Sequence, residues 1–378
     1  MIKFDLLNLS NEKEDIGAKS WICVNRNGIF ETVNIMMDKI ITKENNGREK
    51  ILKNISNVLN SSVTPLRDVF TKNRNIPLPL ILELLKFFSI KEQSMIRKEI
   101  NKKIRFLKCN SNKSQKIKPV KKLSITICKI IGAIMADGNI TRQIGVQCKN
   151  IDKLKEIIAT IKKILPEQKF PINQVSRTRF RITFVVSKNN LDNVLTFLPK
   201  DKEVTIWNKS QIDLTDQDLK AVIDFKNWIK ECFGIEVRIK KISKKNAWRI
   251  NFDNKIISRI LIKFFDVPIG NKTDFVFEPK IIKNSTLNFR KSFMIGVMSF
   301  DGSVSKDGTT ELLLKSKILR DDISQIAKLS GFKYSKTEIS DKKGRWNLRF
   351  SSTKKSRPLL LQLFEPGINK RLRLQGLC

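Results

Sequence analysis

Two short segments constrain the fold of this chain more than any other feature: IIGAIMADG at residues 130–138 and MIGVMSFDG at residues 294–302. Both are apolar, both carry a glycine at the third position, and both end in Asp-Gly. We expect two helices whose backbones touch at Gly132 and Gly296, because glycine lets two backbones approach closely. An isolated Asp-Gly at a helix end is usually only a capping turn. A matched pair instead indicates a duplicated fold in which Asp137 and Asp301 meet at one end of the helix pair.

The net charge indicates a polyanionic partner. The 378 residues include 74 Lys and Arg against 37 Asp and Glu, a formal net charge of +37 that is spread along the chain. Nucleic acid is the leading candidate, because cations gain free energy by releasing counterions from the phosphate backbone. No apolar run approaches the roughly 18 residues needed to cross a bilayer, and residues 1–17 lack the pattern of a signal peptide. We therefore expect a cytoplasmic protein that binds no membrane.

The absence of histidine excludes several kinds of site. Without His there is no Ser-His-Asp triad, no Cys-His pair and no imidazole general base. The six cysteines have no CxxC spacing, so we expect reduced, structural thiols and not a metal site. The chemistry left for two convergent carboxylates is to hold a hard divalent cation, Mg²⁺ or Mn²⁺, which prefers oxygen ligands. Asp137 and Asp301 are the candidate ligands, helped by the backbone carbonyls of Ala136 and Phe300.

The region before the first motif carries no catalytic signature. Residues 1–108 are expected to be mainly helical, with two helices between residues 77 and 108 that join near Ser89. These helices form either a helix-turn-helix-like DNA arm or a small helical domain that presents a basic face. Residues 109–122, CNSNKSQKIKPVKK, are polar and basic and contain a proline, which indicates a linker whose lysines lie on phosphates.

The remainder of the chain repeats one pattern. After each Asp-Gly we expect a strand pair, a helix, a second strand pair and a helix, which predicts an α+β fold of two pseudo-symmetric halves at residues 123–200 and 286–378. A third, partial unit at residues 201–285 has a helix at 218–233, strands at 236–242 and 247–252, and a helix at 254–265. We expect this unit to be attached to the first half.

Several predicted strands alternate basic and apolar residues. In RTRFRITF, at residues 177–184, three arginines fall on one face and three apolar residues on the other, because successive side chains of a strand point to opposite faces. A basic face suits a sheet that lies in a DNA groove, where arginine can form two hydrogen bonds to guanine. The candidate DNA contacts are Arg142, Arg177, Arg179, Arg181, Arg238, Lys240, Arg249, Lys315, Lys317 and Arg349.

The two motifs resemble the paired signature of the LAGLIDADG homing endonucleases. IIGAIMADGNI, the segment from FFDVPIGNKT to MIGVMSFDGSV, and KSKILRD are similar to archaeal members, including those embedded in inteins. The resemblance extends from about Asn110 to the C-terminus. It implies two α/β halves with the motif helices at their interface, a saddle of antiparallel strands over double-stranded DNA, and Mg²⁺-dependent cleavage of both strands. It also implies that Asp137 and Asp301 bind metal; the earlier acidic position of each motif is Met135 or Ser299 here and is not a ligand.

The resemblance also implies one basic residue in each half that polarises the scissile region. PIGNKT places this residue at Lys272 in the first half, and PGINKR places its counterpart at Lys370 in the second. Lys202 is a rival in the first half, because its distance from Asp137 along the chain is closer to that between Asp301 and Lys370. Each of these lysines has phosphate contact as the alternative role.

The leading hypothesis is a monomeric, sequence-specific DNA endonuclease that hydrolyses both strands with Mg²⁺. The alternative is a catalytically inactive protein on the same fold, either a DNA-binding regulator or a maturase that holds intron RNA. Intein splicing does not follow from the resemblance, since the chain begins with Met, contains no His and ends in Gly-Leu-Cys.

Overall fold

The computed structural model describes residues 2–10, 15, 18–111, 114–176, 178–186, 188–198, 204–270, 274–339 and 344–377. The α-helices are α1 (Phe30–Glu44), α2 (Arg48–Val58), α3 (Thr64–Thr71), α4 (Leu78–Leu85), α5 (Ile90–Lys103), α6 (Ile125–Ala136), α7 (Ile151–Lys162), α8 (Lys188–Phe197), α9 (Leu219–Phe233), α10 (Lys255–Phe265), α11 (Lys280–Lys283), α12 (Leu287–Asp301), α13 (Lys317–Leu329), α14 (Arg357–Leu360) and α15 (Asn369–Gln375). The 3₁₀ turns are η1 (Leu6–Leu9), η2 (Ala18–Ser20), η3 (Ser243–Lys245) and η4 (Leu361–Leu363).

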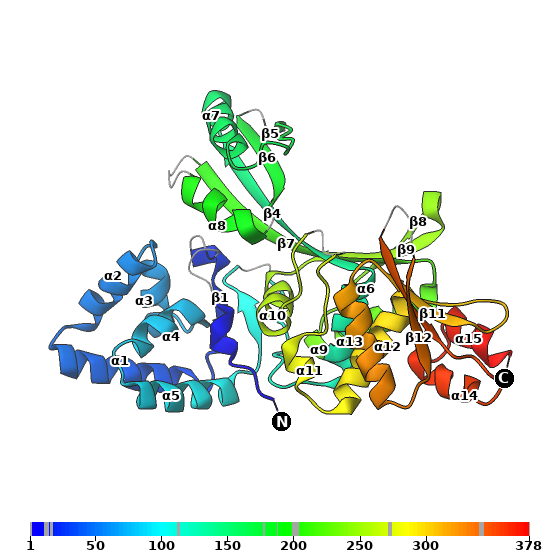
Figure 1. Cartoon of the computed structure of the whole chain (residues 1–378). Helices are drawn as coiled ribbons and strands as arrows, with labels where there is room; N and C mark the ends of the chain where they lie inside the picture. Colours follow the sequence, from blue (N-terminus) through cyan, green and yellow to red (C-terminus); the bar gives the residue numbers. More distant parts are fainter. Residues whose placement is uncertain are drawn as a thin grey trace.

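The strands form three sheets. They are β1 (Ile22–Val24), β2 (Ile76–Pro77), β3 (Leu107–Cys109), β4 (Gly138–Cys148), β5 (Asn173–Ser176), β6 (Arg179–Val186), β7 (Val204–Asp216), β8 (Ile239–Ile242), β9 (Ala247–Asp253), β10 (Gly302–Val304), β11 (Thr310–Leu314), β12 (Tyr334–Ile339) and β13 (Arg345–Phe350). The sheet orders are β2-β1-β3, β5-β6-β4-β7-β9-β8 and β10-β11-β13-β12, with every pairing antiparallel. The α+β class is therefore confirmed (Figure 1).

Helices α6 and α12 pack side by side at the centre of the larger part of the molecule. Glycine makes this packing possible, because a Cβ atom added at Gly132 would lie 2.2 Å from the carbonyl oxygen of Phe293. On the other helix, a Cβ atom at Gly296 would lie 2.3 Å from the carbonyl oxygen of Lys129. Both distances are far below van der Waals contact. The two motif glycines thus lie where the helix backbones touch.

The two larger sheets repeat one topology and one register. Strands β4, β7, β9 and β8 follow the same order as β10, β11, β13 and β12. Gly138 of the first motif pairs with Leu214, and Gly302 of the second pairs with Leu312 in the same way. Further along, Asp216 lies opposite Trp248, while Leu314 lies opposite Trp346. By this register, Trp248, Ile250 and Phe252 of β9 are equivalent to Trp346, Leu348 and Phe350 of β13.

The prediction of a strand pair directly after Asp137 is wrong. The structure has a single strand there, β4, whose antiparallel partner is β7, more than fifty residues later in the chain. Residues 149–203 lie between these two strands, at the position of the short β10–β11 turn in the other sheet. The expected boundary between residues 200 and 201 therefore falls just before a strand that pairs along the whole length of β4.

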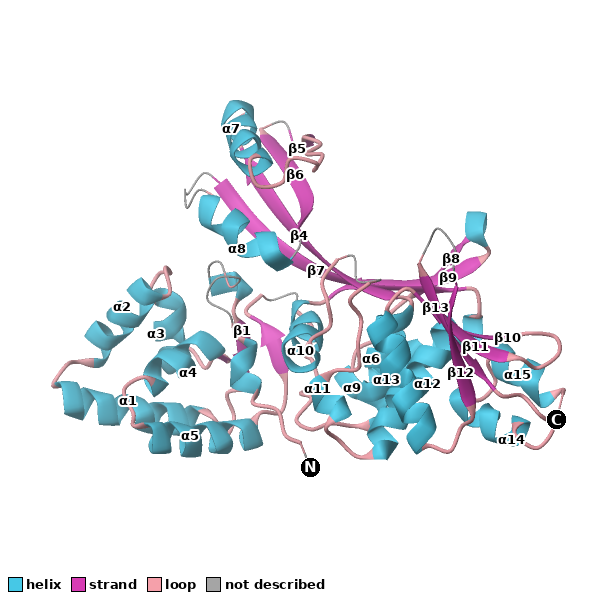
Figure 2. Cartoon of the chain, viewed as in Figure 1, coloured by secondary structure: helices cyan, strands magenta, loops and turns pink. Residues whose placement is uncertain are grey.

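Helices α7 and α8 and strands β5 and β6 form a lobe with the outer ends of β4 and β7. This lobe projects away from the rest of the molecule (Figure 2). It has its own hydrophobic cluster, separate from the main core, because α7 and α8 pack on one face of the strands. The buried members are Ile144, Val146, Cys148, Leu154, Ile157, Ile161, Ile182, Phe184, Val186, Val194, Leu198 and Val204.

The two helices and two strands predicted at residues 218–265 are largely confirmed. The helix, the two strands and the final helix correspond to α9, β8, β9 and α10, although β8 begins at Ile239 and not at residue 236. In the second half, the strand pair β10–β11 and the helix α13 follow Asp301 as expected. These segments have clear periodicity, which is why the sequence predicted them correctly.

The N-terminal region is mainly helical. The expected joint near Ser89 is confirmed, because α4 ends at Leu85 and Ser89 caps α5 in a capping box with Glu92. Nearly every residue of α4 is buried, whereas α5 buries only Ile100. Helix α4 is therefore a core helix, and α5 lies at the surface.

Several lysines of the 109–122 segment contact the protein itself. Lys118 donates from its backbone N–H to the carbonyl of Phe233 at 2.9 Å and from Nζ to the carbonyl of Glu231 at 3.2 Å. The Nζ atom of Lys121 donates to the carbonyl of Lys102 at 2.9 Å. This segment is therefore packed against its neighbours along part of its length.

Helix α10 holds the N-terminal region against the rest of the chain. Arg259 is fully buried and donates to the carboxylate of Asp15 at 3.0 Å, and Lys255 reaches the same carboxylate at 2.7 Å. The rings of Phe4 and Phe264 stack with centroids 4.8 Å apart. One hydrophobic cluster runs from the N-terminal helices through α6 and α12, so the N-terminal region shares the main core.

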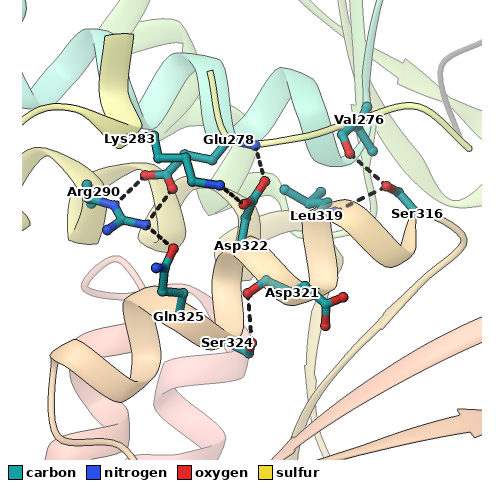
Figure 3. Close-up of polar contacts among 10 residues, drawn as sticks. All are labelled: Val276, Glu278, Lys283, Arg290, Ser316, Leu319, Asp321, Asp322, Ser324 and Gln325. Atoms are coloured by element: carbon teal, nitrogen blue, oxygen red, sulfur yellow. Dashed lines mark hydrogen bonds and ion pairs between the residues drawn. The ribbon is translucent and has the colours of Figure 1, made fainter. Parts of the chain in front are cut away.

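A polar cluster fixes the segment that leads into α12 (Figure 3). Glu278 is buried and accepts two hydrogen bonds from Arg290 of α12, at 2.8 and 2.7 Å. The backbone N–H of Glu278 donates to Asp322 of α13 at 2.8 Å, and Lys283 donates to the same carboxylate at 2.7 Å. Glu278 raises the pKa of Arg290, since it stabilises the charged guanidinium. Helix α12 is thereby tied to α13.

No helix in the part of the chain that the structure describes is long and apolar enough to span a bilayer.

Candidate functional site

The two motif aspartates lie at the C-terminal ends of the packed helices. Asp137 is the C-cap of α6, where its backbone N–H donates to the carbonyl of Ala133 at 3.1 Å, and its side chain is exposed. Asp301 is the last residue of α12 and is half-buried. Each aspartate is followed by the glycine that begins a strand, β4 or β10. The duplicated helix-to-strand turn therefore places one carboxylate at the start of each sheet.

Lys370 of α15 lies at the C-terminal end of α12, next to Asp301. Its Nζ atom donates to the carbonyls of Ser299, at 2.9 Å, and Phe300, which are at the C-terminal end of α12. Burial lowers the pKa of Lys370, and nearby carboxylates oppose that shift, among them Asp137 and Asp301. Asp137 and Lys370 line one cavity, and so do Phe300 and Gly302, the neighbours of Asp301 in the chain. The structure thus brings three sequence-predicted residues, Asp137, Asp301 and Lys370, to one place.

Two further carboxylates in this place were missed from the sequence. Asp216 ends β7, and its Oδ1 accepts a hydrogen bond from the backbone N–H of Asp218 at 2.6 Å. Burial raises the pKa of Asp216 to about 6, with Lys370 acting in the opposite direction. Asp218 is the N-cap of α9 and also accepts from the backbone N–H of Asn369 at 2.6 Å. The sequence signal was the Asp-Gln-Asp run directly before a helix, which is typical of an N-cap.

An open cavity of about 740 Å³ contains these groups. It lies between the end of β7, the start of β10 and the N-terminus of α15. Asp137, Asp216, Asp218 and Lys370 line it, together with Arg373. The cavity therefore offers both carboxylate oxygens and cations to a ligand that carries charge and bound metal.

The donor set fits a hard cation that keeps part of its water shell. No group of three or more acidic, Cys or His side chains that could hold a metal ion occurs among the residues that the structure describes. Mg²⁺, however, is usually held by one or two carboxylates together with water and substrate phosphates. Asp137 and Asp301 supply such carboxylates beside the cavity. The Phe300 carbonyl, expected as a further ligand, accepts a hydrogen bond from Lys370.

The basic residues expected to contact DNA are distributed over both sheets. Lys240 of β8 lies opposite Arg249 of β9, on the face that the helices do not cover. Arg249 forms a two-pronged ion pair with Asp213 of β7, and Arg349 lies 3.6 Å from Glu311. Both of these arginines thus have a carboxylate partner on a neighbouring strand.

The other candidates differ in their surroundings. Arg142 is 6% exposed and lies on the face of β4 that carries Ile140 and Ile144, which is the helix-covered face. Lys317 stands over the ring of Trp346, with Nζ 4.8 Å from its centroid. Exposed candidates are Arg179, Arg238 and Lys315, and Arg181 is half-buried. Arg177, Lys272 and the rival Lys202 lie outside the described residues.

The helix-free face of the six-stranded sheet carries uncharged polar side chains beside its ion pairs. The strand register places Asn139, Asp213 and Asn251 in one row, and Thr141, Gln211 and Asp253 in the next. Gln211 donates to Asn251 at 2.9 Å. Asn and Gln are side chains that read adenine edges in DNA. Sequence reasoning missed them because it looked only for alternating cations.

Comparisons with known proteins identify neighbours of similar architecture only at low similarity. No family model and no curated protein matches the chain. The solved structure of I-DmoI in complex with DNA and calcium is 9% identical, covers 67% of this chain and 97% of that chain, and has a TM-score of 0.36. The I-LtrWI LAGLIDADG homing endonuclease bound to target DNA is 11% identical, covers 63% of this chain and 82% of that chain, and has a TM-score of 0.32. The function proposed below is drawn from the motifs and geometry of this chain.

Proposed function

We propose that the chain is a LAGLIDADG-type homing endonuclease that binds double-stranded DNA and hydrolyses both strands with Mg²⁺ or Mn²⁺. The observation that carries the proposal is that Asp137, Asp301 and Lys370 meet at the end of a helix pair that joins two sheets of equal strand order. Both halves are in one chain, so we propose that the monomer is the active form.

Each residue of the site has a role in this proposal. Asp137 and Asp301 hold the divalent cation through carboxylate oxygens. When bound, the cation supplies an activated water and stabilises charge on the phosphate oxygens. Lys370 orients the scissile phosphate or stabilises its negative charge, and its bonds to α12 fix its position. Asp216 and Asp218 hold Lys370 and the start of α15 in place.

DNA would lie on the helix-free faces of the two sheets. The rows of Asn, Gln and Thr in the six-stranded sheet are suited to base edges in the major groove, while Lys240 and Lys315 are placed for phosphates. The cavity of about 740 Å³ would then face the backbone of the DNA near the centre of the site.

The direct test is cleavage of a plasmid that carries the chromosomal DNA flanking this gene. We expect the protein with Mg²⁺ to linearise the plasmid, and Asp137→Asn to lower the rate by about 10³-fold, because loss of metal binding removes several kcal/mol of transition-state stabilisation. Binding of the same DNA in EDTA should be unchanged within about threefold. A matched control is Asp266→Asn, an exposed helix cap in the left-handed region that Asn also favours.

If the wild type and Asp137→Asn both bind the plasmid and both leave it supercoiled, the enzymatic proposal is wrong. The second candidate would then apply: a DNA-binding regulator or an RNA maturase on the same fold. One observation favours it, namely that Lys370 is already engaged by the carbonyls of α12 and could serve only to cap that helix. Tighter binding of structured intron RNA than of duplex DNA would identify the maturase.

A further inference from the structure

We propose that the lobe formed by α7, α8, β5, β6 and the outer ends of β4 and β7 lengthens the DNA-binding surface of the six-stranded sheet and thereby extends the recognition site on one side only. This inference rests on the proposed DNA binding but not on cleavage. The occupant is duplex DNA that continues beyond the segment covered by the two symmetric halves.

The helix-free face of the lobe continues the helix-free face of the rest of the six-stranded sheet, here called the main sheet. Strand β4 runs without interruption from the motif aspartate into the lobe, paired with β7 along its full length. In the outermost complete row, the register places four residues side by side on this face: Asn173, Arg181, Gln147 and Thr205. DNA lying on the main sheet can therefore meet the lobe without crossing a helix.

The opposite face of the lobe is closed. Leu154, Ile157 and Ile161 of α7 pack in the same hydrophobic cluster as Ile144 and Val146 of β4. Since side chains alternate along a strand, Gln143 and Gln147 point away from α7. Polar residues thus occupy the one sheet face of the lobe that its helices leave open.

Charge complementarity distinguishes this surface from the main sheet. In the main sheet, Arg249 pairs with Asp213, and Lys209 lies 3.4 Å from Asp253. In the lobe, no residue of β5, β6 or residues 144–148 and 204–208 is acidic. Arg179 is exposed there, one alternation away from Arg181. These strands therefore carry cations with no acidic residue among them, as suits a phosphate-binding surface.

The length of β4 sets how far the extension reaches. Cys148 is ten residues beyond Gly138, which corresponds to about 33 Å of strand. At about 3.4 Å per base step, this distance allows contact up to about ten base pairs from the cleavage centre. The equivalent strand β10 has only three residues. The footprint should thus be longer on the side of the first half.

The test compares two double variants with equal changes of charge. Arg179→Ala with Arg181→Ala removes the cations of the open face, and Lys162→Ala with Lys163→Ala removes two exposed cations at the end of α7. The probe is a 40-base-pair duplex of mixed sequence in EDTA, titrated at several salt concentrations. We expect the arginine variant to lower the slope of log K against log salt by about two, and the lysine variant to leave it unchanged.

Selection of bound sequences from a random duplex library, also in EDTA, measures whether the recognition site is longer on one side of its centre. The wild type should select a site that is longer on one side of its centre, and the arginine variant should lose the outer positions of that side only. Arg179→Glu, at an exposed position, gives a second variant if the double one is poorly folded by circular dichroism. Equal salt slopes for all variants, or a symmetric site, would overturn the inference. Neither assay involves cleavage, so a failed nuclease assay would leave both readouts intact.

Discussion

The role of the Lys370 side chain distinguishes a catalytic site from a purely structural cluster of charges. Its Nζ donates to the carbonyls of Ser299 and Phe300, at the C-terminal end of α12. Cations at a helix C-terminus stabilise the helix through its unsatisfied carbonyls. The same ammonium group lies near Asp137 and Asp301, where a scissile phosphate would bind. The two roles are compatible, and substitution can separate their sizes.

We predict that Lys370→Met lowers the free energy of unfolding by about 1–3 kcal/mol, because two carbonyls lose their donor and Asp216 loses the attraction of a cation. Urea denaturation at pH 7 measures this change. The control is Lys328→Met, at an exposed lysine in the last turn of α13, which should change stability by less than about 0.5 kcal/mol. Equal effects of the two substitutions would contradict the proposed contact.

The sequence predicted the convergent residues but not their surroundings. Asp137 and Asp301 could be predicted because the same apolar run precedes both. Lys370 came from the resemblance alone. Asp216 and Asp218 could not be assigned, because they lie at and just after the end of β7, and β7 was not recognised as a strand. Asn208 and Ser210 interrupt its apolar alternation, and its partner β4 lies on the other side of the lobe in the sequence.

At the scale of elements, the helix pair depends on contacts that no side chain larger than hydrogen allows. Ala is normally better than Gly in a helix by about 1 kcal/mol, because it has lower conformational entropy to lose. Gly132 and Gly296 reverse this preference, since each would bring a Cβ atom within 2.3 Å of a carbonyl oxygen of the partner helix. Either the helices separate, or the backbone shifts.

We predict that Gly132→Ala destabilises the protein by about 2–4 kcal/mol, a sum of overpacking and lost core contact. The measurement is the midpoint of urea unfolding at constant m-value. Gly376→Ala is the matched control, because a Cβ atom there would meet nothing closer than 3.7 Å. A neutral or stabilising effect of Gly132→Ala would show that α6 and α12 are not packed as described.

The strands show where periodicity fails as a predictor. Segments with a regular pattern, such as α9, β9 and α10, were predicted closely. The strand pair after Asp137 was wrong because a single strand of eleven residues contains Thr, Arg and Gln between its apolar residues, which reads equally well as two short strands with a turn. Only pairing with β7 decides between these structures, and pairing across a lobe leaves no local signal.

At the scale of the whole molecule, the N-terminal region is joined to the rest of the chain by buried charges. Arg259 and Lys255 both contact Asp15, and Arg259 also donates to the carbonyl of Leu9 at 3.0 Å. The two contacts of Arg259 connect segments 244 and 250 positions apart in the sequence. Residues 1–108 were interpreted from the sequence as a possible separate arm. Neither Asp15 nor Arg259, an arginine within an apolar helix, indicates its partner in the sequence.

This docking should depend on pH in a defined direction. Burial alone disfavours the charged carboxylate, but Arg259 and Lys255 outweigh it and lower the pKa of Asp15 below its ordinary value. A carboxylate with a lowered pKa in the folded state contributes stability that is fully present above its unfolded pKa. The contribution is lost as the pH falls through the folded pKa. The relevant window therefore begins near pH 4 and extends downward.

We predict that Asp15→Asn destabilises the protein by about 3 kcal/mol at pH 7, since two buried cations lose their counterion. The difference from wild type should shrink as the pH falls below about 4, because wild-type Asp15 is then protonated as well. Urea unfolding from pH 7 to pH 3 measures both effects. Asp38→Asn is the control, because that carboxylate is exposed and pairs only with Arg48 and Asn34. If the Asp15 difference stays constant across this range, the ionised carboxylate does not hold the N-terminal region in place.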